Sequence, residues 1–177
     1  MERADLITRL ARTLRDVPDF PGRGIVFKDI TPVLADAELF VALTEAMADP
    51  FRRRGITHVA GIESRGFLLA APIAQSLAAG VIPIRKAGKL PAATISQQYA
   101  LEYGTGTLEV HADACPPQSR VLLVDDVLAT GGTAQAASTL ITRAGGTLIG
   151  YSFFIALRFL AGRARLPAGA VEVLLDC

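Results

Sequence analysis

Short apolar runs that alternate with helical segments constrain the fold of this chain more than any other feature. The runs cover residues 58–62, 81–84, 121–124 and 147–156, and helical patterns over residues 66–79 and about 133–144 lie in two of the gaps between them. The runs do not alternate apolar with polar residues, as a strand with one solvent-facing side would. Strands that are buried on both faces are typical of parallel sheets covered by helices. The pattern therefore predicts an α/β fold with an open, mostly parallel central sheet flanked by helices.

The remaining segments add smaller parts to this sheet. Leucine and isoleucine at helical spacing predict a short amphipathic helix over residues 3–15, and Asp36 is placed to cap a second helix. Residues 86–117 show no helical pattern, and two strands over 94–101 and 107–111 would form a polar hairpin that stands off the sheet. We expect one domain over residues 1–177. Its N-terminal helix and a small hood would occupy residues 1–35, and the core would occupy residues 36–177, with the hairpin as a flexible flap at about 94–111.

The charge of the chain is balanced. Lys and Arg number 18, Asp and Glu number 17, and the formal net charge is +1. Such a chain has no general attraction for nucleic acid or an anionic membrane, so we expect neither as a partner, and any anion must be held by a local cluster. The 2 cysteines and 2 histidines give no zinc-binding spacing, and the cysteines are typical of reduced thiols. We therefore expect a cytoplasmic protein with no signal peptide, no membrane span and no dedicated metal site.

The strongest motif is the segment VLLVDDVLATGGT at residues 121–133. A buried strand ends in Asp125 and Asp126, and a turn from Thr130 to Thr133 opens a helix. Ligands of open α/β sheets bind at the carboxyl ends of the strands, and clustered backbone N–H groups, hydroxyls and a helix N-terminus favour a phosphate. Because the two carboxylates would repel that phosphate, they need another partner, either sugar hydroxyls or a metal that accompanies the phosphate. A simple helix cap would explain an Asp-Asp pair alone, but it does not explain the whole segment.

Basic residues follow two other predicted strands. Arg65 lies in the segment ESRG at residues 63–66, and its planar guanidinium suits a diphosphate. Arg85, Lys86 and Lys89 form a basic cluster after the next strand and could supply the local anion site. The alternatives are a surface ion pair for Arg65 and a solvated basic turn for the cluster.

Residues 121–133 resemble the phosphoribosyl-diphosphate signature of the type I phosphoribosyltransferases. Four more segments, at residues 26–32, 61–67, 85–91 and 99–104, are similar to those of the adenine-specific members of that family, and the similarity covers about residues 5–160. The resemblance implies that the chain transfers the 5-phosphoribosyl group from phosphoribosyl diphosphate to adenine, giving AMP and pyrophosphate in purine salvage. It also implies Mg²⁺ bound mainly through the diphosphate and ribose of the substrate. A homodimer is expected from the resemblance and because Phe20, Phe40 and Phe51 lie outside the predicted sheet strands and need cover.

The resemblance also implies roles for individual residues. The 5-phosphate would be held by the turn made of Ala129, Thr130, Gly131, Gly132 and Thr133. Asp125 and Asp126 would orient the ribose and take part in catalysis, and the diphosphate would be bound by Arg65, Lys86, Lys89 and Tyr103. Glu102 in the hairpin would carry the purine proton. Adenine would be bound in the hood by Val26, Phe27 and Lys28, the last at a position where many relatives carry Arg. The peptide bond between Glu63 and Ser64 would be cis, and Arg85 would point away from the diphosphate.

Two other functions are compatible with the sequence. The chain could be a transferase of the same fold that acts on hypoxanthine, guanine, xanthine or orotate. It could also be a regulator that senses phosphoribosyl diphosphate and binds nucleic acid. The balanced charge, the lack of a helix-turn-helix segment and the presence of Glu102 count against the regulator. Residues after 155 carry little motif content, and we assign no site there.

Overall fold

The computed structural model describes residues 2–100, 105–167 and 169–177. By their internal contacts these residues form two compact units, Met1–Ala46 and Met47–Cys177. The boundary expected at residues 35/36 and the single-domain organisation stay predictions. No helix in the described part of the chain is both long and apolar enough to cross a membrane.

The N-terminal unit combines short helices with a two-stranded sheet. Strands β1 and β2 are antiparallel, with Arg15 opposite Asp29 and Pro18 opposite Val26. The helix predicted over residues 3–15 is confirmed with Leu6 and Leu10 buried at helical spacing, but it ends at Thr13, and Arg15 already begins β1. The pairing of β1 with β2 across the Pro/Gly-rich loop was not predicted. The elements are α1 (Arg3–Thr13), β1 (Arg15–Pro18), β2 (Val26–Asp29), α2 (Thr31–Ala35) and all but the last two residues of α3 (Ala37–Ala48).

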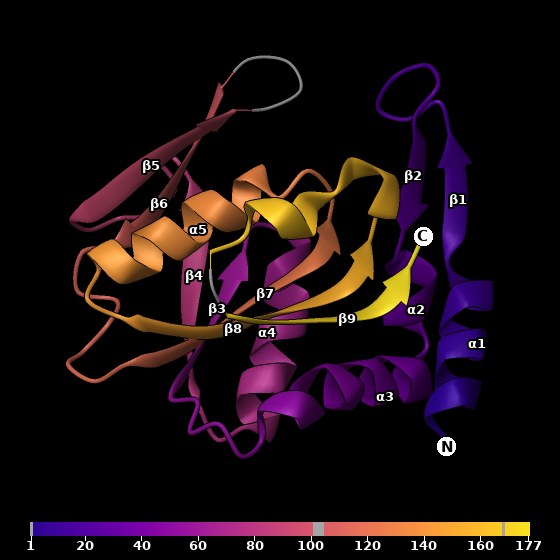
Figure 1. Ribbon diagram of the computed structural model, residues 1–177, viewed down its shortest axis with the longest axis horizontal. Helices are drawn as coiled ribbons and strands as arrows, with labels where there is room; N and C mark the ends of the chain where they lie inside the picture. The colour runs from indigo at the N-terminus through magenta and orange to yellow at the C-terminus, as the bar shows by residue number, and fades with distance from the viewer. Residues whose placement is uncertain (1, 101–104, 168) are drawn as a thin grey trace. The chain divides into compact units, whose positions relative to one another are not determined.

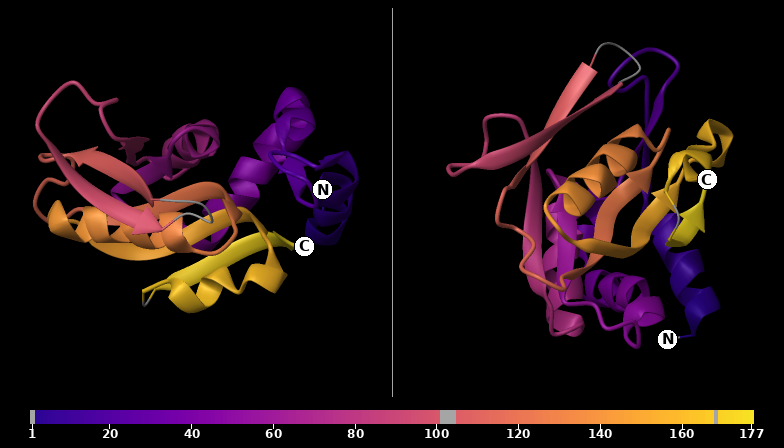
Figure 2. Two further views of the ribbon diagram at one scale, coloured as in Figure 1. Left: turned by 90° about the horizontal axis from the view of Figure 1, so that it is seen from above. Right: turned by 60° about the vertical axis from the view of Figure 1, so that its left-hand side comes forward.

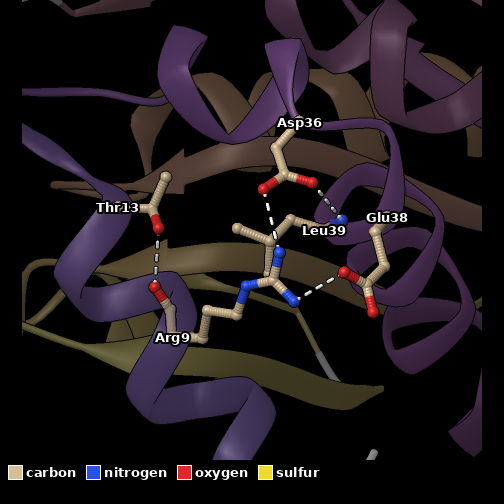
Figure 3. Close-up of polar contacts among 5 residues, drawn as sticks. All are labelled: Arg9, Thr13, Asp36, Glu38 and Leu39. Carbon is tan, nitrogen blue, oxygen red and sulfur yellow. Dashed lines mark hydrogen bonds and ion pairs between the residues drawn. The ribbon is translucent and has the colours of Figure 1, made fainter.

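Arg9 fastens helix α1 to the start of helix α3 (Figure 3). Its guanidinium donates hydrogen bonds to Asp36 at 3.0 Å and to Glu38 at 2.8 Å. The second carboxylate oxygen of Asp36 accepts the backbone N–H of Leu39 at 3.0 Å, as expected of a helix cap. The Leu39 N–H holds the pKa of Asp36 below its ordinary value, and Arg9 adds to the effect. One arginine thus joins two helices and supports the cap of the second.

The second unit is built on a seven-stranded sheet (Figure 1). Strands β3, β4, β7, β8 and β9 are parallel, and β5 and β6 add an antiparallel hairpin at one edge. Helices α4 and α5 cover opposite faces of the sheet, which confirms the predicted fold class (Figure 1). The strand order is β5 (Thr94–Ala100), β6 (Thr105–His111), β4 (Gly80–Lys86), β3 (His58–Ile62), β7 (Arg120–Leu128), β8 (Thr147–Ala156) and β9 (Ala170–Asp176). The helical segments are α4 (Arg65–Ser76), α5 (Gly132–Arg143) and the 3₁₀ turns η1 (Asp49–Phe51), η2 (Arg158–Leu160) and η3 (Gly162–Arg165).

The core explains why the apolar runs do not alternate. Residues 121–124 of β7 are completely buried, since neighbouring side chains point to opposite faces and both faces are covered. Phe51 is also completely buried, and a methyl group added at Gly150 would lie 2.7 Å from its ring. The expectation that Phe51 needs cover from a partner subunit is therefore wrong, because this chain covers it.

The hairpin differs from its prediction in one respect. β6 pairs with the end of β4, Arg85 opposite Glu109 and Lys86 opposite Leu108, so the hairpin continues the sheet instead of standing apart from it. Leu108 and Val110 are buried in the core that α5 covers. Beyond this pairing the two strands extend away from β4 (Figure 2). Of the expected tip at residues 102–106, residues 105 and 106 belong to β6, and residues 102–104 lie outside the described residues.

Candidate active site

Three loops of the second unit leave the sheet at the carboxyl ends of its parallel strands, which is the edge that carries the candidate site. They follow the neighbouring parallel strands β4, β3 and β7, in which Ile62 pairs with Ile84 and Gly61 with Val124. Because parallel strands end on the same side, their loops gather where ligands of α/β sheets bind. The topology therefore brings together the ESRG segment, the basic turn at residues 85–89 and the loop that follows Asp126.

Asp126 and Arg65 form the central ion pair of this edge. Nε of Arg65 donates to Oδ2 of Asp126, and Asp126 is only 4% exposed. Arg65 was predicted as a diphosphate ligand and Asp126 as a ribose ligand, and the structure brings the two side chains into direct contact. The ion pair offsets the desolvation cost of burying the Asp126 carboxylate, which would be large for an unpaired charge.

Asp125 lies against the first turn of helix α4. Its Oδ1 accepts the backbone N–H of Asp126 at 3.0 Å, and a methyl group at Gly66 would lie 2.8 Å from this oxygen. Glycine is therefore needed at position 66 for the helix to approach the strand end. Burial raises the pKa of Asp125 well above its ordinary value, and the charge of Asp126 raises it further.

Glu63 organises the basic turn. The Glu63–Ser64 peptide is cis, as predicted. Oε2 of Glu63 accepts two hydrogen bonds, one from Nε of Arg85 at 3.2 Å and one from the backbone N–H of Lys86 at 3.0 Å. Partial burial raises the pKa of Glu63, but the Lys86 N–H and the charge of Arg85 outweigh it and hold the pKa below its ordinary value. Arg85 also donates to the carbonyl oxygen of Lys89 at 2.9 Å, so it supports the turn from within.

The side chains of Lys86 and Lys89 are left to solvent. Both residues are exposed, and within the described part of the chain neither ammonium group makes an ion pair. The sequence pattern grouped Arg85 with the two lysines as one basic cluster, although the family resemblance implied that Arg85 points away from the diphosphate. The structure separates a half-buried supporting guanidinium from two exposed ammonium groups, and it adds the side chain of Glu63, to which the sequence prediction gave no role.

The predicted phosphate loop joins β7 to α5. Gly131 has φ +82°, in the left-handed region that favours glycine, and helix α5 begins at the next residue. A segment to which sequence analysis assigned no site supports this loop. A methyl group at Gly162 would overlap the carbonyl oxygen of Ala129 and lie 2.9 Å from the backbone nitrogen of Gly131. A cavity of about 190 Å³ borders the same segment, between Leu128, Ala156 and Arg158.

The predicted adenine ligands lie on β2 in the N-terminal unit. The ring of Phe27 packs edge-on against Phe20, with centroids 5.2 Å apart and planes at 77°. Nζ of Lys28 bonds both carboxylate oxygens of Asp16, at 2.7 and 3.0 Å, from the position directly opposite on β1. Val26 is 51% exposed. Asp16 had no predicted role, because pairing across the loop is needed to bring it to Lys28.

Two predicted site residues, Glu102 and Tyr103, lie outside the described residues. Among the described residues, no three or more His, Cys, Asp or Glu side chains gather closely enough to hold a metal ion. Three acidic side chains of the described residues lie at this edge, and two of them are already paired, Asp126 with Arg65 and Glu63 with Arg85. This donor set fits a divalent cation that arrives with a polyphosphate substrate better than a cation held by the protein itself.

Comparisons with known proteins agree with this geometry. Residues 32–165 match the family model described as phosphoribosyl transferase domain. The chain is 57% identical over 168 residues to adenine phosphoribosyltransferase of Streptomyces clavuligerus and 56% identical over 162 residues to that of Thermobifida fusca, covering 94% and 92% of each chain. The crystal structure of adenine phosphoribosyltransferase from Rhodothermus marinus is similar with a TM-score of 0.94 and 51% identity, over 98% of this chain and 99% of that one. The Saccharomyces cerevisiae enzyme, solved with adenine and an imino-altritol bisphosphate, matches with a TM-score of 0.91 and 38% identity, over 97% of this chain and 99% of that one. The chain therefore belongs to the phosphoribosyltransferase family, among the adenine phosphoribosyltransferases.

Proposed function

We propose that this chain transfers the 5-phosphoribosyl group of phosphoribosyl diphosphate to adenine and releases AMP and pyrophosphate, as a purine salvage enzyme. The observation that carries the proposal is the meeting of three loops at one sheet edge, each with a different chemistry. The Asp126–Arg65 pair, the basic turn and the loop at residues 129–133 match the sugar, diphosphate and phosphate of one substrate. The relatives named as adenine phosphoribosyltransferases support adenine as the acceptor.

The phosphoribosyl part of the substrate would be bound at several positions. The backbone N–H groups at the start of α5 and the hydroxyls of Thr130 and Thr133 would hold the 5-phosphate. Arg65, Lys86 and Lys89 would bind the diphosphate, with Tyr103 beside it. Asp125 and Asp126 would accept hydrogen bonds from the ribose hydroxyls, and Ala129, Gly131 and Gly132 would complete the phosphate loop.

The reaction exchanges one bond at the anomeric carbon of the ribose for another. N9 of adenine forms the new bond to this carbon as the bond to the diphosphate oxygen breaks, and the electron pair leaves with pyrophosphate. The ribose gains positive charge in the transition state, which the carboxylates of Asp125 and Asp126 would stabilise. Glu102 would accept the N9 proton. Magnesium, carried by the substrate, would neutralise charge on the leaving diphosphate.

Adenine recognition would fall to residues 1–35, the proposed hood of a single domain whose core is residues 36–177. Phe27 would contact the flat face of the base, and its edge-on contact with Phe20 fixes the orientation of the ring. Val26 would add an apolar contact. Lys28 would act near the edge of the base, with its charge balanced by Asp16.

We also propose a homodimer in the cytoplasm. Large apolar side chains on the surface support the homodimer, since Phe20 is 51% exposed and Val41 is 61% exposed. Cys115 and Cys177 are free thiols, which fits a reducing compartment. Sedimentation at micromolar concentration tests the homodimer, and a monomer there would contradict it.

Product analysis tests the proposed activity. The purified protein is incubated with adenine, phosphoribosyl diphosphate and Mg²⁺, and AMP and pyrophosphate are quantified by chromatography. We expect both products in equal amounts and none after chelation of Mg²⁺. Asp126→Asn should lower the rate, whereas Asp113→Asn, in the exposed turn after β6, should leave it unchanged. Turnover of another base but not of adenine would overturn the choice of acceptor, and substrate binding without turnover of any base would favour the regulator.

A further inference from the structure

The basic turn at residues 85–89 is held by carboxylates on both sides. Glu63, at the end of β3, accepts the Lys86 N–H at 3.0 Å. Glu109, on the hairpin strand β6, accepts the Gly88 N–H through Oε2 at 3.0 Å. Gly88 has φ +75°, so the turn adopts a conformation that favours glycine at this point. Nothing in the roles proposed above involves Glu109.

Strand β6 is joined to the sheet at this same turn. Glu109 pairs with Arg85 and Leu108 pairs with Lys86, and the Ala87 N–H donates to the carbonyl oxygen of Thr107 at 3.1 Å. The root of the hairpin and the basic turn therefore share one set of hydrogen bonds. A change at Glu109 would loosen the turn where it meets the hairpin.

These bonds decide which groups the turn offers to an anion. Successive backbone N–H groups in a turn can form an anion-binding concavity. Here the N–H groups of Lys86, Ala87 and Gly88 are each bonded to an acceptor of the protein. The turn thus presents its lysine ammonium groups, and its backbone serves to fix where those side chains begin.

We infer that Glu109 is a positioning residue that fixes the basic turn for the diphosphate group of the substrate. This inference rests on the proposed function. Two effects of Glu109 on an anion have opposite signs, which makes the inference testable. Its negative charge beside the turn repels a diphosphate, whereas its hydrogen bond to Gly88 holds the turn in place. We infer that the positioning effect is the larger one, because the two lysines lie on an exposed turn that depends on these bonds for its order.

The test compares Glu109→Ala and Glu109→Gln with Asp113→Asn in the full-length protein. Asp113→Asn removes one negative charge from the turn that follows β6 and serves as the matched control. Magnesium pyrophosphate and magnesium phosphoribosyl diphosphate are titrated into each variant by calorimetry. We expect Glu109→Ala to weaken both by about 5-fold, the effect of losing one hydrogen bond. Glu109→Gln should stay within about 2-fold of wild type, because its amide oxygen can accept the Gly88 N–H. Asp113→Asn should bind both diphosphates as wild type does, and the KM for adenine should be the same in all variants.

Amide hydrogen exchange gives a second readout that does not depend on activity. In Glu109→Ala the peptide that covers residues 86–89 should exchange faster than in wild type, with no change in helix α5. Unchanged or tighter binding of the diphosphates by Glu109→Ala would overturn the inference, because the charge repulsion of Glu109 would then be at least as large as its positioning effect. Equal losses in the Ala and Gln variants would also overturn it, since the hydrogen bond would not be the cause.

The outcomes separate this inference from the proposed function. If wild type binds pyrophosphate but makes no AMP, the proposed function fails, and the pyrophosphate titration still decides the role of Glu109. If wild type makes AMP and the alanine variant binds normally, the inference alone fails. If wild type binds neither diphosphate, both fail.

Discussion

Gly162→Ala should damage the phosphate loop from a position that was assigned no role by sequence analysis. Gly162 is the first residue of the 3₁₀ turn η3, and its α-carbon faces the backbone of the loop between β7 and α5. An added methyl group would overlap the carbonyl oxygen of Ala129. The same methyl group would lie 3.0 Å from the carbonyl carbon of Ala129 and 2.9 Å from the backbone nitrogen of Gly131. All of these neighbours are backbone atoms, which cannot rotate away as a side chain can.

The size of the effect follows from this crowding. Forcing a methyl group into a packed site costs about 1–3 kcal/mol. The chain can relieve the overlap by unpacking residues 158–165 or by moving the loop at residues 129–131. The first route lowers the free energy of unfolding, and the second misplaces the groups proposed to hold the 5-phosphate. A cost of about 1–3 kcal/mol taken up by the loop would raise the KM for phosphoribosyl diphosphate by about 5- to 150-fold.

Steady-state kinetics and urea unfolding test this expectation together. We expect a higher KM for phosphoribosyl diphosphate, an unchanged KM for adenine and a lower free energy of unfolding. Gly22→Ala is the control for a glycine-to-alanine change, because a methyl group there would meet only the Ile25 side chain at 3.8 Å. A wild-type free energy of unfolding together with a wild-type KM for phosphoribosyl diphosphate in Gly162→Ala would refute the reasoning, since the neighbouring backbone would then leave room for a side chain at position 162.

Three further predictions concern other parts of the site. In the folded protein the pKa of Asp125 is raised, so the folded state holds this proton to a higher pH than the unfolded state does, and stability falls as pH rises between the two pKa values. Asp125→Asn should therefore gain stability relative to wild type from about pH 4 upward, as measured by urea unfolding, and a constant difference would contradict this. Asp16→Ala should raise the KM for adenine and leave that for phosphoribosyl diphosphate unchanged, because Lys28 would lose its partner; equal changes in both would show a general loss of the hood. Glu102→Gln should lower kcat by about 10²-fold or more with near-normal binding of phosphoribosyl diphosphate, and a wild-type kcat, with chemistry shown to be rate-limiting, would end the role of Glu102 in proton transfer.

The sheet could be predicted because its signal is local. Residues 121–124 are apolar without alternation, and burial on both faces explains the pattern. The place of Asp125 and Asp126 at the carboxyl end of the sheet could be predicted for a related reason. They follow a buried strand directly, and a strand end of a parallel sheet is where ligands bind. The identity of the substrate came from the resemblance of whole segments and not from these patterns.

The contacts that sequence reasoning missed all join distant segments. Gly162 meets the phosphate loop about 30 residues earlier, and Glu109 meets Gly88 through the pairing of an antiparallel strand. Hydrophobic periodicity carries no information on which strand will pair with which, or on which loop will lie against another. The same limit explains why Arg85 was grouped with the lysines. Its inward orientation depends on Glu63, 22 residues earlier.

Competition between two purines tests the central claim most directly. Adenine and hypoxanthine are supplied at equal concentrations with limiting magnesium phosphoribosyl diphosphate, and the ratio of AMP to IMP gives the ratio of the two kcat/KM values. A site with fixed donors and acceptors rejects a base whose six-position changes from amino to oxo, because buried polar groups lose their partners. We predict that AMP exceeds IMP by at least about 100-fold. Comparable amounts of AMP and IMP would contradict the proposal that this chain is an adenine-specific phosphoribosyltransferase.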